Sequence, residues 1–391
     1  MAYINFKEEL FVAKKQLDKR INNNDKLFKN IMRSKNISNN FTPDSKYSFK
    51  TFDNTLFGNE KIDSEDNFKE VCNKDIICSV FTNCRFFNIK FSDCNFIGCT
   101  FIGCDFGSGG ITFENCIFVK EDSDKIPTLN NKDNFSCHFK DCNIYGKFLN
   151  CMLNYTIFEW CNLENTSFTL SDMSSVIISN SRLSMIILSD VDLSGTKILE
   201  TYIENLEFRD KYKSKIDEKT FIDKIKFEKK TRSEYEGIYM VYETIADKFK
   251  ENNLNNNFGE YYYLAKITEY KTLNPLPKVA SFIAWMTCGF GERPLYAVYS
   301  SLFIILLFSI LYLLVGFDID GQIINFSTLV NNFSITYIID SLNESLNLSV
   351  GMFAGVGFNN AQPIPLSYMI CNAEMLIGVI MMGLGIGTLT K

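Results

Sequence analysis

Large apolar residues recur at every fifth position through the middle of the chain. The series opens with Phe81, Phe86 and Phe91, and a small or aliphatic residue stands two positions before each member, as at Ser79 and Cys84. A period of five fits neither the α-helix nor the β-strand, so each unit must turn a corner. The two marked residues of each unit then point inward and stack on those of the next coil. The pattern therefore predicts a solenoid.

The series is interrupted in two places and then continues to residue 208. Its register jumps at Gly107–Gly110, and a polar insertion over 120–134 follows Phe118. After a slip of one residue the members are Leu153, Phe158, Leu163, Phe168, Met173, Ile178, Leu183, Leu188, Leu193, Ile198, Ile203 and Phe208. We expect about 22 repeats in five to six coils, spaced by the ~4.8 Å that separates neighbouring strands.

This pattern resembles the pentapeptide-repeat family over about 130 residues. The resemblance implies a right-handed, four-sided β-helix with one pentapeptide per side, over residues 71–208. Nine of the 13 cysteines fall in the small inward position, where they serve as small buried side chains. No Cys-x-x-Cys pair occurs, and His138 is the single histidine, so we expect no metal site and no histidine-based catalysis.

Helical patterns flank the repeats on both sides. Residues 1–70 predict a short helix followed by a polar segment rich in Asn, Lys, Ser and Asp. Residues 209–293 predict a cytoplasmic helical connector, with the helices EYEGIYMVYETIADKFKEN and EYYYLAKITEYK separated by the turn NNLNNNFG.

Two long apolar runs dominate the last hundred residues. Leu295–Phe317 has no charged residue, and Leu366–Leu389 has only Glu374. About 20 apolar residues suffice to cross the hydrocarbon core of a bilayer. The runs therefore predict two membrane helices, 295–317 and 366–389, in a membrane domain over 294–391. The alternative is a buried helix hairpin, which is disfavoured because a core helix is seldom apolar on every face for this length.

The basic residues indicate the orientation of these two helices. Lys266, Lys271, Lys278 and Arg293 precede the first helix and Lys391 follows the second, whereas the loop between the helices has acids and no base. Basic residues favour the cytoplasmic side. We therefore expect a multi-pass protein of the cell (plasma) membrane, in contact with lipid and with both termini in the cytoplasm. A cytoplasmic β-helix also disfavours disulfides.

The segment between the runs, 341–363, is helical in pattern up to about Phe353 and then rich in glycine. Irregular backbone is tolerated at membrane depth only where it lines a cavity or is buried in protein, so we expect a re-entrant pore loop. Its motif GVGFNNAQP resembles the selectivity filter of the potassium-channel superfamily, with Val356, Gly357 and Phe358 matching Val-Gly-Tyr. The sequence GFGERP at 289–294 also resembles the segment before the first helix of bacterial proteins that join pentapeptide repeats to a two-helix pore domain.

The motif departs from the potassium filter at four positions. Ala354 and Gly355 replace threonines, Asn359 replaces the second glycine and Asn360 replaces aspartate. We therefore expect the filter, Ala354–Asn360, to pass small monovalent cations, K⁺ or Na⁺, without strict selectivity for potassium. The alternative is a glycine-rich loop that only closes a hairpin.

One chain supplies one loop, so a ring of carbonyl groups needs several copies, and the resemblance implies a homotetramer. In the second membrane helix we expect Glu374 to face protein or water rather than lipid, bracing the filter or lining the cavity. Gly378 and Gly383 are candidates for a gating hinge, and close helix packing is the alternative.

The net charge and the catalytic motifs that the sequence lacks argue against some classes of function. The chain has 40 Lys+Arg and 46 Asp+Glu, a net charge of −6, which argues against nucleic acid as a partner. No phosphate loop, nucleophile elbow or metal-spaced His/Cys set occurs, so we expect no enzyme. The first hypothesis is an ion channel whose β-helix serves for assembly or sensing. The alternative is a membrane-anchored module whose β-helix binds a cytoplasmic partner.

Overall fold

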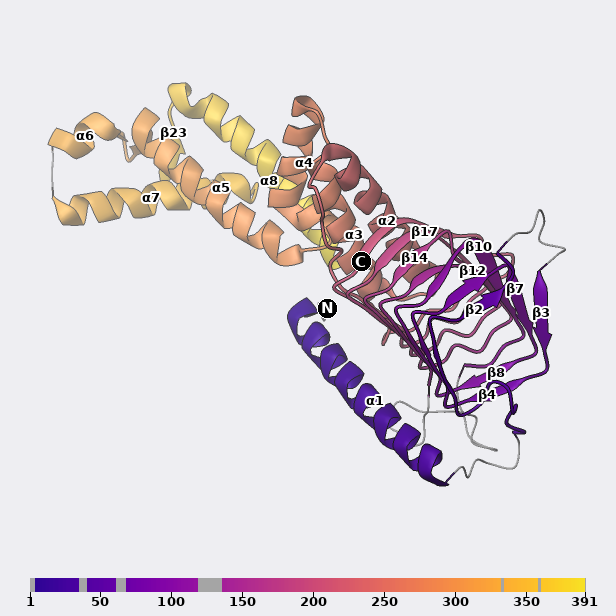
Figure 1. Ribbon diagram of the computed structural model, residues 1–391. Coiled ribbons are helices and arrows are strands. Elements are labelled where there is room, and N and C mark those ends of the chain that lie inside the picture. The colour runs from indigo at the N-terminus through magenta and orange to yellow at the C-terminus, as the bar shows by residue number, and fades with distance from the viewer. Residues whose placement is uncertain are drawn as a thin grey trace. The chain divides into compact units, whose positions relative to one another are not determined.

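The computed structural model describes residues 4–34, 41–60, 68–118, 136–331, 334–357 and 360–390. The chain forms two compact units, Met1–Thr272 and Leu273–Lys391. The first unit contains a β-solenoid with helices packed on it, and the second unit is mainly helical (Figure 1).

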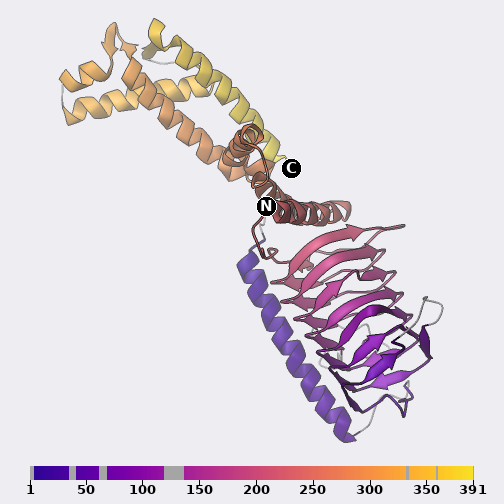
Figure 2. The ribbon, with the colours of Figure 1, turned by 45° about the horizontal axis from the view of Figure 1, so that its top comes forward.

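The solenoid is built from short parallel strands that stack into about seven turns, as Figure 2 shows. The strands are β1 (Thr51–Asp53), β2 (Leu56–Gly58), β3 (Lys69–Cys72), β4 (Asp75–Ile77), β5 (Val80–Thr82), β6 (Arg85–Phe87), β7 (Ile89–Ser92), β8 (Asn95–Ile97), β9 (Thr100–Ile102), β10 (Asp105–Glu114), β11 (His138–Lys140), β12 (Asn143–Leu149), β13 (Ile157–Glu159), β14 (Asn162–Glu164), β15 (Ser167–Thr169), β16 (Ile177–Ser179), β17 (Arg182–Ser189), β18 (Lys197–Leu199), β19 (Tyr202–Phe208) and β20 (Phe221–Ile222). One side is an eight-stranded sheet in the order β1-β5-β9-β11-β13-β16-β18-β20, and β10, β12, β17 and β19 belong to a second, larger sheet.

The five-residue period produces the core that the sequence predicts. Along the eight-stranded sheet, Phe52, Phe81, Phe101, Phe139 and Phe158 stack ring on ring, with centroids 4.6 to 5.1 Å apart. This spacing is that of neighbouring strands, so each coil places its ring directly on the ring before it. Burial of these large side chains supplies most of the stabilisation of the solenoid.

Most corners of the coils use a residue in the left-handed backbone region. The residue two positions after the large apolar one has a positive φ in most repeats, for example 49° at Asn83, 48° at Asn88 and 53° at Asp93. Asn and Asp are the non-glycine residues that adopt this region most readily. The corner position is therefore a second mark of the repeat, beside the two inward positions.

The solenoid is longer than the predicted 71–208 and has more turns than the predicted five to six. It begins with a bridge at Pro43 and ends with β20 at Ile222. The first coil keeps the large apolar positions, at Phe52 and Phe57, but has Lys50 in the small position. No earlier coil packs on this position among the described residues, so a long polar side chain is accommodated there.

Helix α1 (Phe6–Ser34) runs along the outside of the solenoid (Figure 2). Its Ala13 and Leu17 pack on outward-facing residues of the eight-stranded sheet, which are Ile157, Ile177, Leu199 and Phe221. The buried guanidinium of Arg20 donates hydrogen bonds to the carbonyls of Tyr155 (3.0 Å) and Ser175 (2.7 Å), and burial lowers its pKa to about 10. The predicted short N-terminal helix is therefore a long helix of the solenoid unit.

Helices α2 (Arg232–Glu251) and α3 (Asn255–Tyr270) close the C-terminal end of the solenoid core. The hydroxyl of Tyr261 accepts from the amide of Ile222 (2.9 Å), and that of Tyr242 accepts from the amide of Ile225 (2.8 Å). The edge of the last coil thus has hydrogen-bond partners instead of an open strand. The predicted turn NNLNNNFG is wrong in part, because Asn255–Gly259 is the first turn of α3.

The predicted connector over 209–293 divides between the two units. Its first two helices belong to the solenoid unit, and α4 (Pro275–Cys288) belongs to the second unit. The rest of the second unit consists of η2 (Gly289–Gly291), α5 (Pro294–Val315), β21 (Phe317–Ile319), β22 (Gln322–Ile324), α6 (Phe326–Asn331), α7 (Ile335–Phe353), β23 (Ala361–Pro363), η3 (Pro365–Ser367) and α8 (Tyr368–Leu389).

Two helical segments of the described chain are long and apolar enough to cross a membrane. They are Pro294–Val315, with a mean hydropathy of 2.5, and Pro365–Leu389, with 1.9. Only 22% of the apolar window of each is buried inside the chain, whereas a core hairpin would bury most of it. Their bounds lie within two residues of the predicted 295–317 and 366–389.

Candidate functional site: the loop between two apolar helices

Helix α7 packs lengthwise against α5 in the second unit. The hydroxyls of Ser309 and Ser345 lie 2.8 Å apart, and the hydroxyl of Ser349 donates to the carbonyl of Ile305 (2.8 Å). The later residue on α7 meets the earlier residue on α5, so the two helices are antiparallel. Pairing of buried serines satisfies polar groups that would otherwise be costly in an apolar unit.

Glu374 joins the three long helices of the unit. Its carboxylate accepts a hydrogen bond from the hydroxyl of Tyr312 on α5 (2.7 Å) and another from the hydroxyl of Ser349 on α7, while Glu374 itself belongs to α8. The side chain is fully buried. Glu374 therefore faces protein within the single chain, behind the end of α7, which is one of the two places expected from the sequence.

The end of α7 lies beside the middle of α8. A Cβ atom added to Gly378 would lie 2.0 Å from the carbonyl oxygen of Phe353, the last residue of α7. Gly378 is the eleventh of the 22 residues of α8. This contact is close packing and uses the absence of a side chain, so it favours the packing interpretation over the hinge at this position. Gly383 has open space around its Cβ position.

After α7 the chain returns to the end of the helix pair at which α5 ends. Ala361 of β23 pairs with Ile319 of β21, the strand that directly follows α5. Ala354 therefore lies at the middle of the helix pair, and Ala361 lies at one end of it. The structure places Ala354, Gly355, Val356, Gly357 and Asn360 on this return path, while Phe358 and Asn359 lie outside the described residues.

Three successive backbone N–H groups after α7 point back toward the end of that helix. The amide of Gly355 donates to the carbonyl of Met352 (3.1 Å), and those of Val356 (3.1 Å) and Gly357 (3.3 Å) donate to the carbonyl of Gly351. In a trans peptide the N–H and the C=O point in opposite directions. The three carbonyls that share these peptides, on residues 354, 355 and 356, therefore point away from α7.

This orientation depends on glycine at two positions. Gly355 has φ of 68° and Gly357 has φ of 95°, and Val356 between them does not have a positive φ. Glycine adopts such angles without strain, whereas other residues adopt them at a cost. The side chain of Val356 is 86% exposed, and 354, 355 and 357 are exposed as well. Three carbonyl oxygens and the partial negative charge at the C-terminus of α7 together favour a cation at this face.

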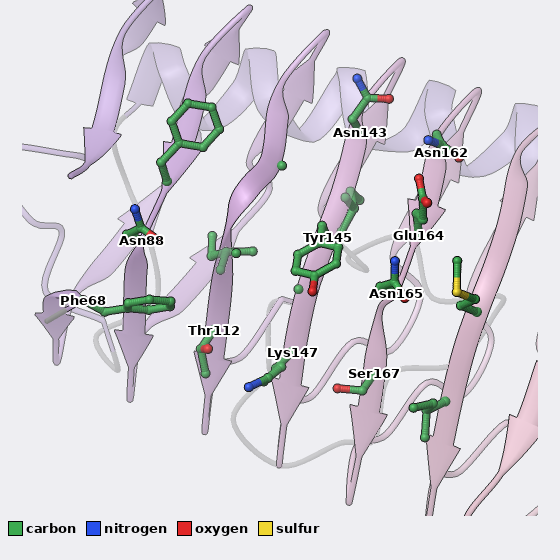
Figure 3. Close-up of a pocket in the computed structure, with 18 of the residues that line it drawn as sticks. Phe68, Asn88, Thr112, Asn143, Tyr145, Lys147, Asn162, Glu164, Asn165 and Ser167 are labelled. Carbon is green, nitrogen blue, oxygen red and sulfur yellow. The ribbon is translucent and has the colours of Figure 1, made fainter. Parts of the chain in front are cut away.

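A groove on the solenoid was not anticipated from the sequence. It has a volume of about 1440 Å³ and lies on the outer face of the larger sheet (Figure 3). Asn143, Tyr145 and Lys147 project into it from alternate positions of β12, and Glu164 and Ser167 come from the next coil. The sequence held part of the evidence for this groove. The large apolar residues Ile144 and Phe148 are four residues apart instead of five, so this repeat is one residue short and β12 continues through a corner.

Comparison with known proteins supports the repeat assignment. The family profile described as pentapeptide repeats matches residues 79–108 and 156–195, in eight copies. Together with the parallel strand ladder, this confirms a pentapeptide-repeat β-solenoid in this chain. Comparison with curated proteins gives no match.

Several solved structures resemble the chain in part. One is QnrB1, described as a plasmid-mediated fluoroquinolone resistance protein, with 18% identity and a TM-score of 0.25, covering 41% of this chain and 66% of that one. Another is HetL, a pentapeptide repeat protein involved in heterocyst differentiation regulation from the cyanobacterium Nostoc sp. strain PCC 7120. It has 12% identity and a TM-score of 0.16, covering 41% of this chain and 74% of that one. The alignment thus spans just under two thirds of the QnrB1 chain.

Proposed function

We propose that the chain forms a homotetrameric pore for small monovalent cations, with the loop Ala354–Asn360 around a central axis and the solenoid serving for assembly or sensing. The observation that carries the proposal is the set of carbonyls of 354, 355 and 356, which point away from α7 on a loop that reaches the middle of α8. A ring of such carbonyls replaces part of the hydration shell of an ion.

Several copies are needed because of where the loop lies. If α5 and α8 span a bilayer, residues 354–357 lie at membrane depth with their backbone exposed in the single chain. Lipid does not solvate irregular backbone, whereas a water-filled cavity between copies does. Fourfold symmetry follows from the resemblance to two-helix pore domains, and a closed ring is the ordinary form of such an assembly.

Selectivity is expected to be weak. Gly355 lacks the hydroxyl that a threonine would add at the inner end of the filter, and Asn360 lacks the charge of aspartate. Fewer and less rigid ligands reduce the difference in free energy between binding K⁺ and binding Na⁺. Glu374 contributes by holding the end of α7 through Ser349, so it is a positioning residue and not a ligand of the ion.

The test compares cation flux into liposomes that contain the purified full-length protein with flux for two glycine variants. Gly357→Ala and Gly385→Ala each place a methyl group in open space, but only Gly357 has a positive φ, of 95°. A non-glycine residue in such a conformation costs about 1–2 kcal/mol. We expect flux for the wild type and Gly385→Ala, and a loss of at least tenfold for Gly357→Ala. Equal flux for both variants would count against the loop as the pathway.

The groove favours a second candidate function, a membrane-anchored module that binds a partner through the solenoid. Its wall combines an aromatic ring, amides and charges of both signs, from Tyr145, Asn165, Glu164 and Arg209. A photo-crosslinking residue at position 145 would give one defined adduct in cells, whereas the same residue at Tyr212, 77% exposed outside the groove, would give none. Equal labelling from both positions would remove this candidate.

A further inference from the structure

Helix α4 presents apolar side chains over most of its surface. The exposed large apolar residues of this 14-residue helix are Leu276, Val279, Phe282, Ile283, Trp285 and Met286, with exposed fractions of 36% to 86%. Lys278 is the single charged residue between Thr272 and Gly291. A surface of this kind is poorly suited to water, and large contiguous apolar patches mark sites of contact with protein or membrane.

The helix is too short to span a bilayer. At 1.5 Å per residue its 14 residues are about 21 Å long, whereas the hydrocarbon core is about 30 Å thick. It also does not extend α5 into a longer span. Gly289, Phe290 and Gly291 have φ values of 54°, 58° and 85°, so the chain turns sharply between the two helices. A Cβ on Gly289 would lie 2.5 Å from the Cβ of Arg293, so the turn is too tight for a side chain there.

The end of α4 is fixed at the level of the first turns of α5. The hydroxyl of Ser300, in the second turn of α5, donates to the carbonyl of Met286 (2.6 Å). If α5 enters the bilayer at Pro294, the C-terminal half of α4 therefore lies at the depth of the headgroups and the upper acyl chains. Exposed apolar residues continue from α4 onto the start of α5, at Leu295 and Val298.

We propose that α4 is an interfacial helix that lies in the plane of the bilayer surface, with lipid as the partner of its apolar side chains. Lipid is favoured over a protein partner because the apolar surface of α4 is continuous with that of a helix long enough to span the membrane. Trp285 and Lys278 are residue types that prefer the boundary between headgroups and acyl chains. The proposal rests on insertion of α5 and α8 in the membrane, and it does not depend on conduction.

The chain offers its own reporter for this proposal. It has two tryptophans, Trp160 on the solenoid and Trp285 on α4. In Trp160→Phe the fluorescence comes from Trp285 alone, and in Trp285→Phe it comes from Trp160 alone. Both variants are reconstituted in phosphatidylcholine vesicles whose acyl chains carry bromine either near the glycerol backbone or near the terminal methyl group. Resistance of the protein to alkaline carbonate extraction establishes that it is inserted.

We expect Trp285 to emit at shorter wavelength than Trp160 and to be quenched at least twofold more by bromine near the glycerol backbone than by bromine near the methyl end. Trp160 is expected to show no quenching by either lipid. Replacing Phe282 by Asp in the Trp160→Phe background should shift the Trp285 emission to longer wavelength and reduce the quenching.

Two results would overturn the proposal. Inserted protein whose Trp285 is not quenched by any brominated lipid would show that another part of the protein covers α4. Stronger quenching by bromine near the methyl end would place α4 deep in the bilayer, as part of a helix bundle. Either result leaves the flux comparison at Gly357 unaffected, so this proposal and the proposed pore fail independently.

Discussion

At the scale of single residues, the cysteines of the solenoid are structural. Nine of them stack in three columns through the coils, Cys99–Cys137, Cys84–Cys104–Cys142–Cys161 and Cys94–Cys116–Cys151, and Cys78 is a corner residue buried beside Cys99 outside the columns. Their thiols lie close to carbonyls of the preceding coil, as from Cys104 to Phe81 (3.3 Å). These ten side chains are at most 2% exposed. Burial raises the pKa of the Cys116, Cys137 and Cys142 thiols above the ordinary value.

A buried thiol with a raised pKa provides almost no thiolate, and the thiolate is the reactive form. We predict that a thiol reagent such as dithionitrobenzoate reacts in the native protein with at most three cysteines, the 13 of the chain minus these ten buried ones. All 13 should react in guanidinium chloride. Measured release of more than three equivalents from native protein would show that the columns open or are not formed.

The ion pair between Asp210 and Lys248 links α2 to the solenoid. The two charged atoms are 2.9 Å apart, and the side chains are 9% and 11% exposed. Burial by itself would raise the pKa of Asp210, but hydrogen bonds from Ser214, from the amide of Asp190 and from Lys248 outweigh it and lower the pKa to about 2.

A carboxylate with a lowered pKa stabilises the fold above its unfolded pKa, and this contribution is lost as the pH falls through the folded pKa. We therefore predict that the free energy of unfolding of the solenoid unit falls by roughly 2 kcal/mol between about pH 4 and pH 2 because of this group. Chemical denaturation at several pH values measures it. Asp210→Asn should remove that part of the slope, and an unchanged slope would contradict the assignment.

The residues also show what could be predicted from the sequence. The period of five identified most inward positions from Phe81 to Phe208 because every stacked coil needs them filled, but it did not identify Phe148, which follows Ile144 by four residues. It missed the first coil, where Lys50 replaces the small residue. Glu374 was expected to brace the filter or to line the cavity, but its individual partners could not be identified from the sequence, because Tyr312 and Ser349 are 62 and 25 residues away along the chain. Only the packing of three helices brings these hydroxyls to one carboxylate.

At the scale of elements, the contact between α7 and α8 leaves no room for a side chain at Gly378. Gly378→Ala would place a methyl group 2.0 Å from the carbonyl oxygen of Phe353, so the two helices must separate. We predict a loss of about 1–3 kcal/mol in the stability of the second unit, the usual range for overpacking. Thermal unfolding of the full-length protein in detergent, followed by the emission of Trp285 in the Trp160→Phe background, measures it.

Gly383→Ala is the matched control for this substitution. Its methyl group would enter open space on the same helix, and alanine favours the helix by up to about 1 kcal/mol. We expect this variant to be at least as stable as the wild type in the single chain. A destabilisation equal to that of Gly378→Ala would show that the contact with Phe353 is not the cause.

Long elements were predicted more reliably than short ones. The two apolar helices and the end of α7 at Phe353 lie within two residues of their predicted positions, because an uninterrupted apolar run or a glycine cluster marks each boundary. The three-stranded sheet β21, β22 and β23 was not predicted. Its strands have three residues each, which is too short for a clear pattern, and β23 pairs with β21 across 42 or more residues, which local sequence does not encode.

At the scale of the whole molecule, one chain contains a pentapeptide-repeat solenoid and a unit with two long apolar helices, for which we propose a re-entrant pore loop. The solenoid unit is closed by α2 and α3 at its C-terminal end, and the second unit begins at Leu273. The single chain exposes the loop carbonyls and the apolar faces of α5 and α8. In the arrangement that we propose, lipid covers the apolar faces of α5 and α8, and further copies of the chain surround the loop.

The reversal potential of currents through the purified protein in a planar bilayer tests this account most directly. With potassium chloride at different concentrations on the two sides, we predict currents that reverse near the potassium potential and far from the chloride potential. With potassium on one side and sodium on the other, the reversal should correspond to a permeability ratio within about tenfold, equivalent to ~1.4 kcal/mol. Reversal at the chloride potential, or currents that Gly357→Ala leaves unchanged, would contradict the account.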